Sequence, residues 1–212
     1  MIAKRVRTGC NVTSRTYQPV GMENIMQSGD IAPPIQLSAI DGHAFDSRSL
    51  EGRRYLVTFF RFASCPFCNM RMAELVRRRD ELGEDFEIIA IFEADLEHLQ
   101  KHASQHLAAF PVLADPKRVS YREYGIRKSL FGVIKGIVTR FNVVTMGMLR
   151  GYVPSEISSR LLTMPASFLV DEQGIIQLAY YGRDEGDHLS FDSIKSFARD
   201  VTPFAGCNAV SA

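Results

Sequence analysis

The sequence predicts a three-layer α/β domain in which helices flank a mixed central β-sheet. Two observations indicate this fold class. Apolar runs typical of buried strands alternate with amphipathic segments at helical spacing, and the chain closes with two strands and a helix. A length of 212 residues suits one domain with extensions, and a hydrophobic content of 46% is enough for a core. We expect a flexible extension at 1–28, the domain at 29–203 and a tail at 204–212.

The predicted elements follow one another in a regular order. The first is a hairpin, because short alternating runs flank Asp41-Gly42, a dipeptide favoured in tight turns. A second turn, at residues 171–174, separates the two closing strands. The expected order is strands at 35–39, 43–45 and 55–62, a helix from the cysteine pair to Gly83, a strand at 86–92, a helix at 95–107, a strand at 111–113, a helix at 118–124, strands at 166–170 and 175–181, and a helix at 191–201.

Residues 126–163 interrupt this order with an apolar segment broken by Gly132 and Gly136. We interpret it as a helical insertion before the closing hairpin. Its role stays open among a homodimer interface, a lid over the site, a lipid-facing surface and additional core.

Charge and hydropathy exclude several classes of partner. The chain has 25 Lys and Arg against 24 Asp and Glu, a net charge of +1, which gives no electrostatic basis for binding nucleic acid or an anionic membrane. No run of about 18 apolar residues predicts a spanning helix. The N-terminus has basic residues but lacks the apolar region of a secretory signal. We therefore expect a cytoplasmic protein.

The sequence Cys65-Pro66-Phe67-Cys68 lies between a buried strand and the start of a helix. The first N–H groups of a helix lack internal partners and stabilise a thiolate, which is the attacking species in disulfide exchange and peroxide reduction. We expect Cys65, nearer the helix end and the solvent, to be the nucleophile. Cys68, one turn further in, would be the resolving thiol. Phe67 would shield the sulfurs and offer an apolar surface to a partner.

Two other interpretations of the cysteines are incidental burial and zinc binding. Zinc needs further ligands, and the sequence has no second CxxC motif. His98, His102 and His106 form a stripe at helical spacing, which we interpret as a polar helix flank. We expect neither a metal nor an organic cofactor.

The motif TFFRFASCPFCNMRMAEL resembles thioredoxin-fold redox proteins, most closely the CxxC-containing peroxiredoxin-like branch of the AhpC/TSA family. The segments GDIAPPIQLSAIDGHAFDSRSLEGRRYLVTFF and MPASFLVDEQGIIQLAYYG are similar to the opening and the closing hairpin of that family. The likeness covers residues 29–200, with 126–163 covered poorly. It implies a thioredoxin-like fold and a thiol-dependent redox enzyme.

The chain departs from the peroxiredoxin motif Pro-x-x-x-Thr-x-x-Cys. If Cys65 is the attacking cysteine, Phe62 occupies the position of the threonine. If Cys68 is, Cys65 takes that position and Arg61 replaces the proline. These departures favour dithiol–disulfide exchange over specialised peroxide reduction.

A second departure lies before the closing hairpin, where the family's arginine is replaced by Pro165. This resembles thioredoxin, in which a cis-proline faces the disulfide. We therefore expect a cis Met164–Pro165 bond, and a substrate groove formed by Met164, Pro165, Pro66 and Phe67. The alternative is a trans proline that opens an edge strand.

The expected function is a thiol–disulfide oxidoreductase of the AhpC/TSA type, with a thioredoxin- or glutathione-type thiol as electron donor. A thiol peroxidase and a non-catalytic redox switch acting through residues 126–163 remain as alternatives. Arg61 would supply positive charge beside Cys65, or be an ordinary solvated residue at a strand end. Glu93 is a candidate for moving the proton of the resolving thiol, or a solvated loop acid.

Overall fold

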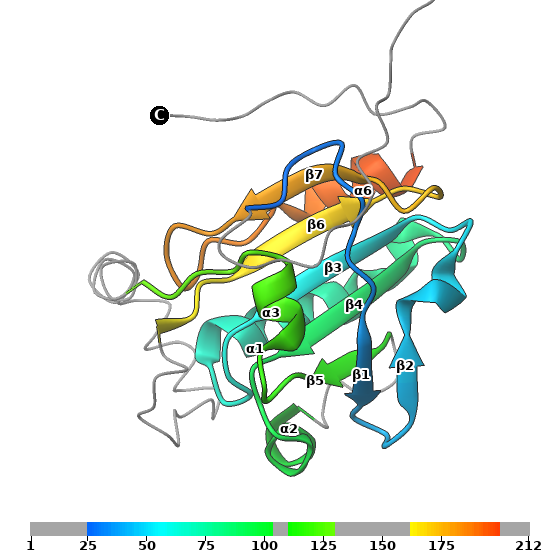
Figure 1. The fold of residues 1–212 in the computed structure, drawn as a ribbon. Coiled ribbons are helices and arrows are strands. Elements are labelled where there is room, and N and C mark those ends of the chain that lie inside the picture. The colour runs from blue at the N-terminus through cyan, green and yellow to red at the C-terminus, as the bar shows by residue number, and fades with distance from the viewer. Residues whose placement is uncertain (1–24, 104–109, 130–161, 200–212) are drawn as a thin grey trace, which may run out of the picture.

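The computed structural model describes residues 25–103, 110–129 and 162–199. They form one seven-stranded sheet in the order β2-β1-β5-β4-β3-β6-β7, with helices on both faces (Figure 1). The elements, with 3-10 helices written η, are β1 (Gln36–Ala39), β2 (Ala44–Asp46), η1 (Ser47–Leu50), β3 (Tyr55–Phe60), α1 (Pro66–Arg77), η2 (Arg79–Leu82), β4 (Glu87–Phe92), α2 (Leu96–Ala103), β5 (Val112–Ala114), α3 (Val119–Glu123), β6 (Ala166–Val170), β7 (Ile176–Tyr181) and α6 (Phe191–Arg199).

The sheet is mixed, as the sequence predicts. β4 runs parallel to both β3 and β5, and the remaining pairs are antiparallel. Each predicted strand is found in its expected place, with ends that differ by a few residues. The helix expected to continue to Gly83 ends at Arg77 and is followed by the 3-10 helix η2, and the predicted ends of the helices at 95–107 and 191–201 lie outside the described residues. The α/β fold class is confirmed.

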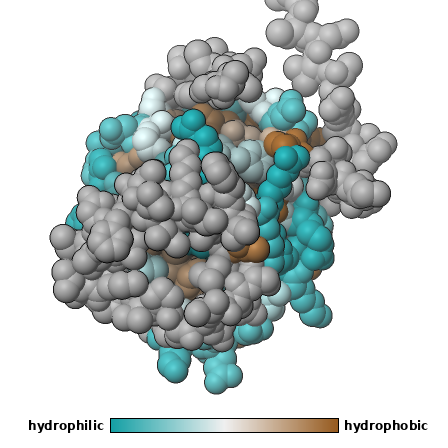
Figure 2. All heavy atoms as spheres, turned by 90° about the vertical axis from the view of Figure 1, so that its left-hand side faces the viewer, coloured by the Kyte–Doolittle hydropathy of each residue, from teal (hydrophilic) through white to brown (hydrophobic). Residues whose placement is uncertain are grey.

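The central strand β3 is buried along its whole length because both faces of the sheet are covered. Its alternate residues Leu56 and Phe60 pack into a cluster with α1, α2 and α6, whereas Val57 and Phe59 pack on the other face against α3. On the face shown in Figure 2, the outer described side chains are mostly hydrophilic and hydrophobic atoms show only in small areas. Among the described helices, none is long and apolar enough to cross a membrane.

Residues 126–129 and 162–164 lie side by side as a short antiparallel stem. Ser129 N donates to Leu162 O at 2.7 Å, and Met164 N donates to Arg127 O at 3.2 Å. Between these two bonds, Lys128 and Thr163 form an antiparallel β-bridge. The described ends of the expected helical insertion are therefore joined to each other through the β-bridge between Lys128 and Thr163. Its residues 130–161 lie outside the described residues, as do most of the predicted N-terminal extension and the whole tail.

The expected cis bond at Met164–Pro165 is wrong, since the described residues contain no cis peptide bond. The reason lies in the neighbouring strand. Gly182 N donates to Pro165 O at 2.8 Å, which continues the β6–β7 ladder beyond Ala166 and keeps the chain extended. Pro165 is not at an edge either, because β6 pairs with β3 on its other side.

Gly182→Ala should destabilise the fold, because the added Cβ would clash with Asp187 O and lie 2.8 Å from Pro165 Cγ. We expect a loss of about 1–3 kcal/mol in the free energy of unfolding, the usual cost of overpacking, measured by urea denaturation. Arg183→Ala, at the next and exposed position, is the control and should change it by less than about 0.5 kcal/mol. Equal stability of the two variants would contradict the close packing at Gly182.

Candidate active site

The two cysteines lie where the buried strand β3 passes into helix α1. Cys65 is the N-cap residue of α1, and Pro66 is the first helical residue, a position that tolerates its missing N–H. Cys68 follows one turn later, and both thiols are free. The sequence therefore places the pair at the helix start, as expected.

Both sulfurs are buried. Cys65 and Cys68 have no exposed surface and belong to the apolar cluster that contains Phe62 and Phe67. The expectation that Cys65 lies near the solvent is wrong. The residues of the first helical turn are buried together with these aromatic side chains, so this turn is part of the core.

Arg61 contacts both sulfurs. Its backbone N–H donates to Cys68 Sγ at 3.4 Å, and its guanidinium Nη1 donates to Cys65 Sγ at 3.8 Å. Arg61 is only 4% exposed, and its guanidinium carbon lies 5.3 Å from the centre of the Phe62 ring. The side chain turns toward the dithiol instead of lying in solvent.

These contacts give the two thiols opposite acidities. Burial raises the pKa of Cys65, but this effect is outweighed by a hydrogen bond from the Cys68 thiol, the charge of Arg61 and the backbone N–H groups of Cys68 and Phe67. The net result lowers the pKa of Cys65 to about 7. Burial and the neighbouring Cys65 sulfur raise the pKa of Cys68 well above its usual value. Cys65 is therefore the thiol that ionises first.

Asn69 is a site residue that sequence reasoning missed. Its side chain is fully buried, and its Nδ2 donates to Ala63 O at 2.7 Å and to Cys65 O at 2.9 Å. These bonds fix the turn that leads from β3 to Cys65. The signal in the sequence is a polar residue directly after CxxC, on the face of the helix that is predicted to be buried.

Glu93 is buried and is not a solvated loop acid. Its carboxylate accepts short hydrogen bonds from Arg118 and Thr163, and Lys128 Nζ lies 3.5 Å from its other oxygen. The described contacts of the carboxylate are thus with cations and a hydroxyl. Its backbone N–H donates to Arg61 O at 2.9 Å, which connects this cluster to the residue that holds both sulfurs.

Met164 and Pro165 directly precede β6, the strand that pairs with β3. Ala166 pairs with Phe59 in the antiparallel β3–β6 ladder. Continuing this register places Pro165 opposite Phe60 and Met164 opposite Arg61. Thr163, the residue before Met164, is held by the Glu93 cluster.

Comparison with known proteins agrees with this architecture. The chain is 24% identical to Rv2521 of Mycobacterium tuberculosis, a protein with a provisional peroxiredoxin name, over 76% of this chain and 89% of that protein. Among solved structures, a peroxiredoxin-like protein from Aquifex aeolicus superimposes with a TM-score of 0.61 at 10% identity, covering 82% of this chain and 87% of that one. Peroxidoxin BcpB from M. tuberculosis gives 0.59 at 14% identity, covering 84% and 99%.

The structural likenesses show a thioredoxin-like fold, which agrees with the fold that the sequence resemblance implied. The model of the AhpC/TSA family matches residues 28–179, which include both cysteines and all the strands up to β7. The match covers well over half of the sequence. The chain therefore belongs to the AhpC/TSA family of thiol redox enzymes.

Proposed function

We propose that the protein is a two-cysteine thiol peroxidase in which Cys65 attacks a hydroperoxide and Cys68 resolves the product. The observation that carries this proposal is a thiol of lowered pKa, bonded to a buried arginine and to a second thiol. A thiolate at this position is a competent nucleophile. Since neither sulfur is exposed, a small oxidant has an advantage over the disulfide of a folded protein.

The proposed reaction has three steps. The Cys65 thiolate attacks one peroxide oxygen, the O–O bond breaks, and the other oxygen leaves as an alkoxide that takes up a proton. Cys68 then attacks the Cys65 sulfenic acid, forming the disulfide and releasing water. An external thiol donor supplies two electrons and two protons to restore the dithiol.

The residues around the dithiol act on the first step. Arg61 and the first N–H groups of α1 stabilise the negative charge before attack. Arg61 thereby supplies positive charge at the attacking sulfur, in a chain whose sequence lacks the family's usual threonine there. The raised pKa of Cys68 keeps that thiol protonated, and able to donate to Cys65, until the sulfenic acid forms.

Thiol–disulfide exchange is the second candidate function. It is favoured by the CxxC spacing at a helix N-terminus, and by the absence of the typical peroxiredoxin motif around either cysteine. The same two sulfurs would carry it, with Cys65 attacking a substrate disulfide. A competition experiment in which the reduced protein meets equal concentrations of hydrogen peroxide and glutathione disulfide separates the two functions. The proposed peroxidase forms its Cys65–Cys68 disulfide mainly by reducing hydrogen peroxide.

We keep the cytoplasm as the proposed location.

Replacement of each cysteine should have a distinct effect on turnover. Cys65→Ser should abolish peroxide consumption with dithiothreitol as donor. Cys68→Ser should still react once and accumulate a Cys65 sulfenic acid, detected by mass spectrometry after trapping with dimedone. The reverse pattern would exchange the two roles. A wild-type protein that oxidises once and is not restored by any donor would support a redox switch instead.

Arg61→Met should shift the pH dependence of the reaction with peroxide. For the wild type, the rate should rise with pH as Cys65 ionises, with a midpoint at about 7. Without the guanidinium, the midpoint should move upward by roughly one pH unit, and the rate at pH 7 should fall about fivefold. Arg61→Lys should recover part of the loss.

The control for this variant is Arg48→Met, which removes an exposed arginine paired with Asp46 and should leave the midpoint unchanged. If Arg61→Met lowers the rate equally at every pH, the arginine does not set the ionisation of Cys65.

A further inference from the structure

The backbone N–H of Arg61 is a hydrogen-bond donor to the second thiol of the site. It donates to Cys68 Sγ at 3.4 Å, and it belongs to the peptide unit that joins Phe60 to Arg61. This peptide is trans, so its C=O and N–H point in opposite directions. A hydrogen bond accepted by the oxygen polarises the unit and strengthens its N–H as a donor. A group that bonds to Phe60 O therefore acts on the sulfur of Cys68.

Tyr121 of α3 bonds to that oxygen. Its hydroxyl donates to Phe60 O at 2.5 Å and lies 3.0 Å from Ile91 O, so one donor serves the ends of β3 and β4 and is nearer to Phe60. The side chain is fully buried. Burial and the neighbouring negative charges raise the pKa of Tyr121 well above its usual value, so the hydroxyl keeps its proton and remains a donor.

The position of this hydroxyl is fixed by the packing of α3. The carboxylate of Asp115 accepts from the first N–H groups of the helix, those of Val119 and Ser120. The Tyr121 ring packs edge-on against Phe59, with the ring centres 5.0 Å apart. The hydroxyl is thus directed at the end of β3 before any reaction begins.

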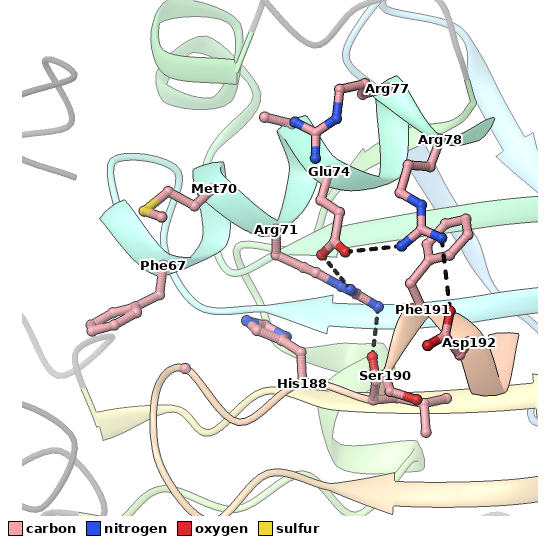
Figure 3. A pocket seen from close by; sticks show the side chains of 13 residues that line it. Phe67, Met70, Arg71, Glu74, Arg77, Arg78, His188, Ser190, Phe191 and Asp192 are labelled. Atoms are coloured by element: carbon pink, nitrogen blue, oxygen red, sulfur yellow. Dashed lines mark hydrogen bonds and ion pairs between the residues drawn. The ribbon is translucent and has the colours of Figure 1, made fainter. Parts of the chain in front are cut away.

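Helix α1, which carries Cys68, is held by a different set of contacts. Figure 3 shows Arg71 and Arg78 bonded across a groove: Arg71 donates to Leu189 O at 2.6 Å, and Arg78 lies 3.8 Å from Asp192 of α6. Neither cysteine lines this groove. These contacts fix the helix and do not bond to the sulfurs, so they set the place of Cys68 but not its ionisation.

We propose that Tyr121 is a positioning residue for the resolution step, because its hydroxyl orients and polarises the Phe60–Arg61 peptide whose N–H stabilises negative charge on Cys68. The inference rests on the proposed function, since it concerns the step that closes the disulfide. In that step the Cys65–Cys68 S–S bond forms and the S–O bond of the sulfenic acid breaks. Cys68 is oxidised, the Cys65 sulfur is reduced, and the Cys68 proton leaves with the hydroxyl group as water. Negative charge gathers on Cys68 as this proton departs, and a stronger N–H donor stabilises it.

The charges near Cys68 are compatible with this role. Cys65 and Arg61 are the titratable and charged groups that act on Cys68. The Cys65 thiolate opposes a second negative charge, but a neutral sulfenic acid has replaced it by the time of resolution. A charge on Cys68 is in turn felt at the Tyr121 hydroxyl, since it contributes to the raised pKa of Tyr121. The two groups are therefore close enough to interact.

The test follows formation and decay of the Cys65 sulfenic acid separately. Reduced protein is mixed with one equivalent of hydrogen peroxide and quenched in acid at timed intervals, and mass spectrometry counts the sulfenic acid and the disulfide. Tyr121→Phe should slow the decay about two- to fivefold, because a hydrogen bond to the reacting sulfur is weakened and not lost. The rate of formation should change by less than about twofold. The pH at which the decay accelerates should also move upward, because the Cys68 thiolate has a weaker donor.

Tyr124→Phe is the matched control. Tyr124 is as buried as Tyr121, its ring also lies 5.0 Å from Phe59, and its hydroxyl also donates to a backbone oxygen, that of Pro33, at 2.9 Å. It should lose similar stability in urea denaturation but resolve at the wild-type rate. Equal slowing of the decay by the two variants, or equal slowing of both steps by Tyr121→Phe, would indicate a structural role only and overturn the proposal. An unchanged decay in Tyr121→Phe would overturn it as well.

Replacement of Tyr121 by 3-fluorotyrosine changes the strength of the bond without removing it. Fluorine makes the phenol a stronger donor, so the sulfenic acid should decay faster than in the wild type, by up to about twofold. A slower or unchanged decay would contradict the proposal. A wild-type protein that forms neither sulfenic acid nor disulfide with peroxide would instead refute the proposed function. The two failures are therefore distinguishable.

Discussion

The ionisation of Cys65 without access to water is the constraint on which the site depends. Burial alone would keep the thiol protonated, because a desolvated ion needs other polar groups to replace its hydration. Here those groups are the guanidinium of Arg61, the thiol of Cys68 and the N–H groups that begin α1. The same burial acts on Cys68, where the neighbouring Cys65 sulfur raises the pKa further and Arg61 offsets these effects only in part. One environment therefore yields two thiols of different acidity, which is the difference that the proposed sequence of attack and resolution uses.

The rest of the domain holds Arg61 in place. Its backbone N–H is bonded to Cys68 and its carbonyl to Glu93, so the residue is fixed on both sides of the strand end. Glu93 is fixed in turn by Arg118, which also donates to Thr163 and to Ile126 O. Arg118 adopts a left-handed backbone with a φ of 55°, a conformation that costs free energy for a residue with a side chain. These contacts connect helix α3, the stem and the dithiol in one polar cluster within an apolar core.

The fold and the position of the cysteine pair could be predicted because their signals are local. Strand β3 is one uninterrupted apolar run, and Cys65 follows it within a few residues. The Glu93 cluster could not be predicted in the same way, since Arg118 and Thr163 lie 25 and 70 residues away in sequence. The cis-proline expectation failed for a similar reason. The likeness to thioredoxin is local, whereas the extended chain at Pro165 is set by its bond to Gly182 on the next strand.

The stem formed by residues 126–129 and 162–164 has a consequence for how such proteins diversify. The chain leaves the sheet region and returns to it at one place, because Ser129 bonds to Leu162 and Met164 to Arg127. Closing a loop costs only slowly more entropy as the loop lengthens. Insertions and deletions between these paired ends therefore need not disturb the register of the strands. Relatives can differ in the length and sequence of this segment and still keep the dithiol beside it.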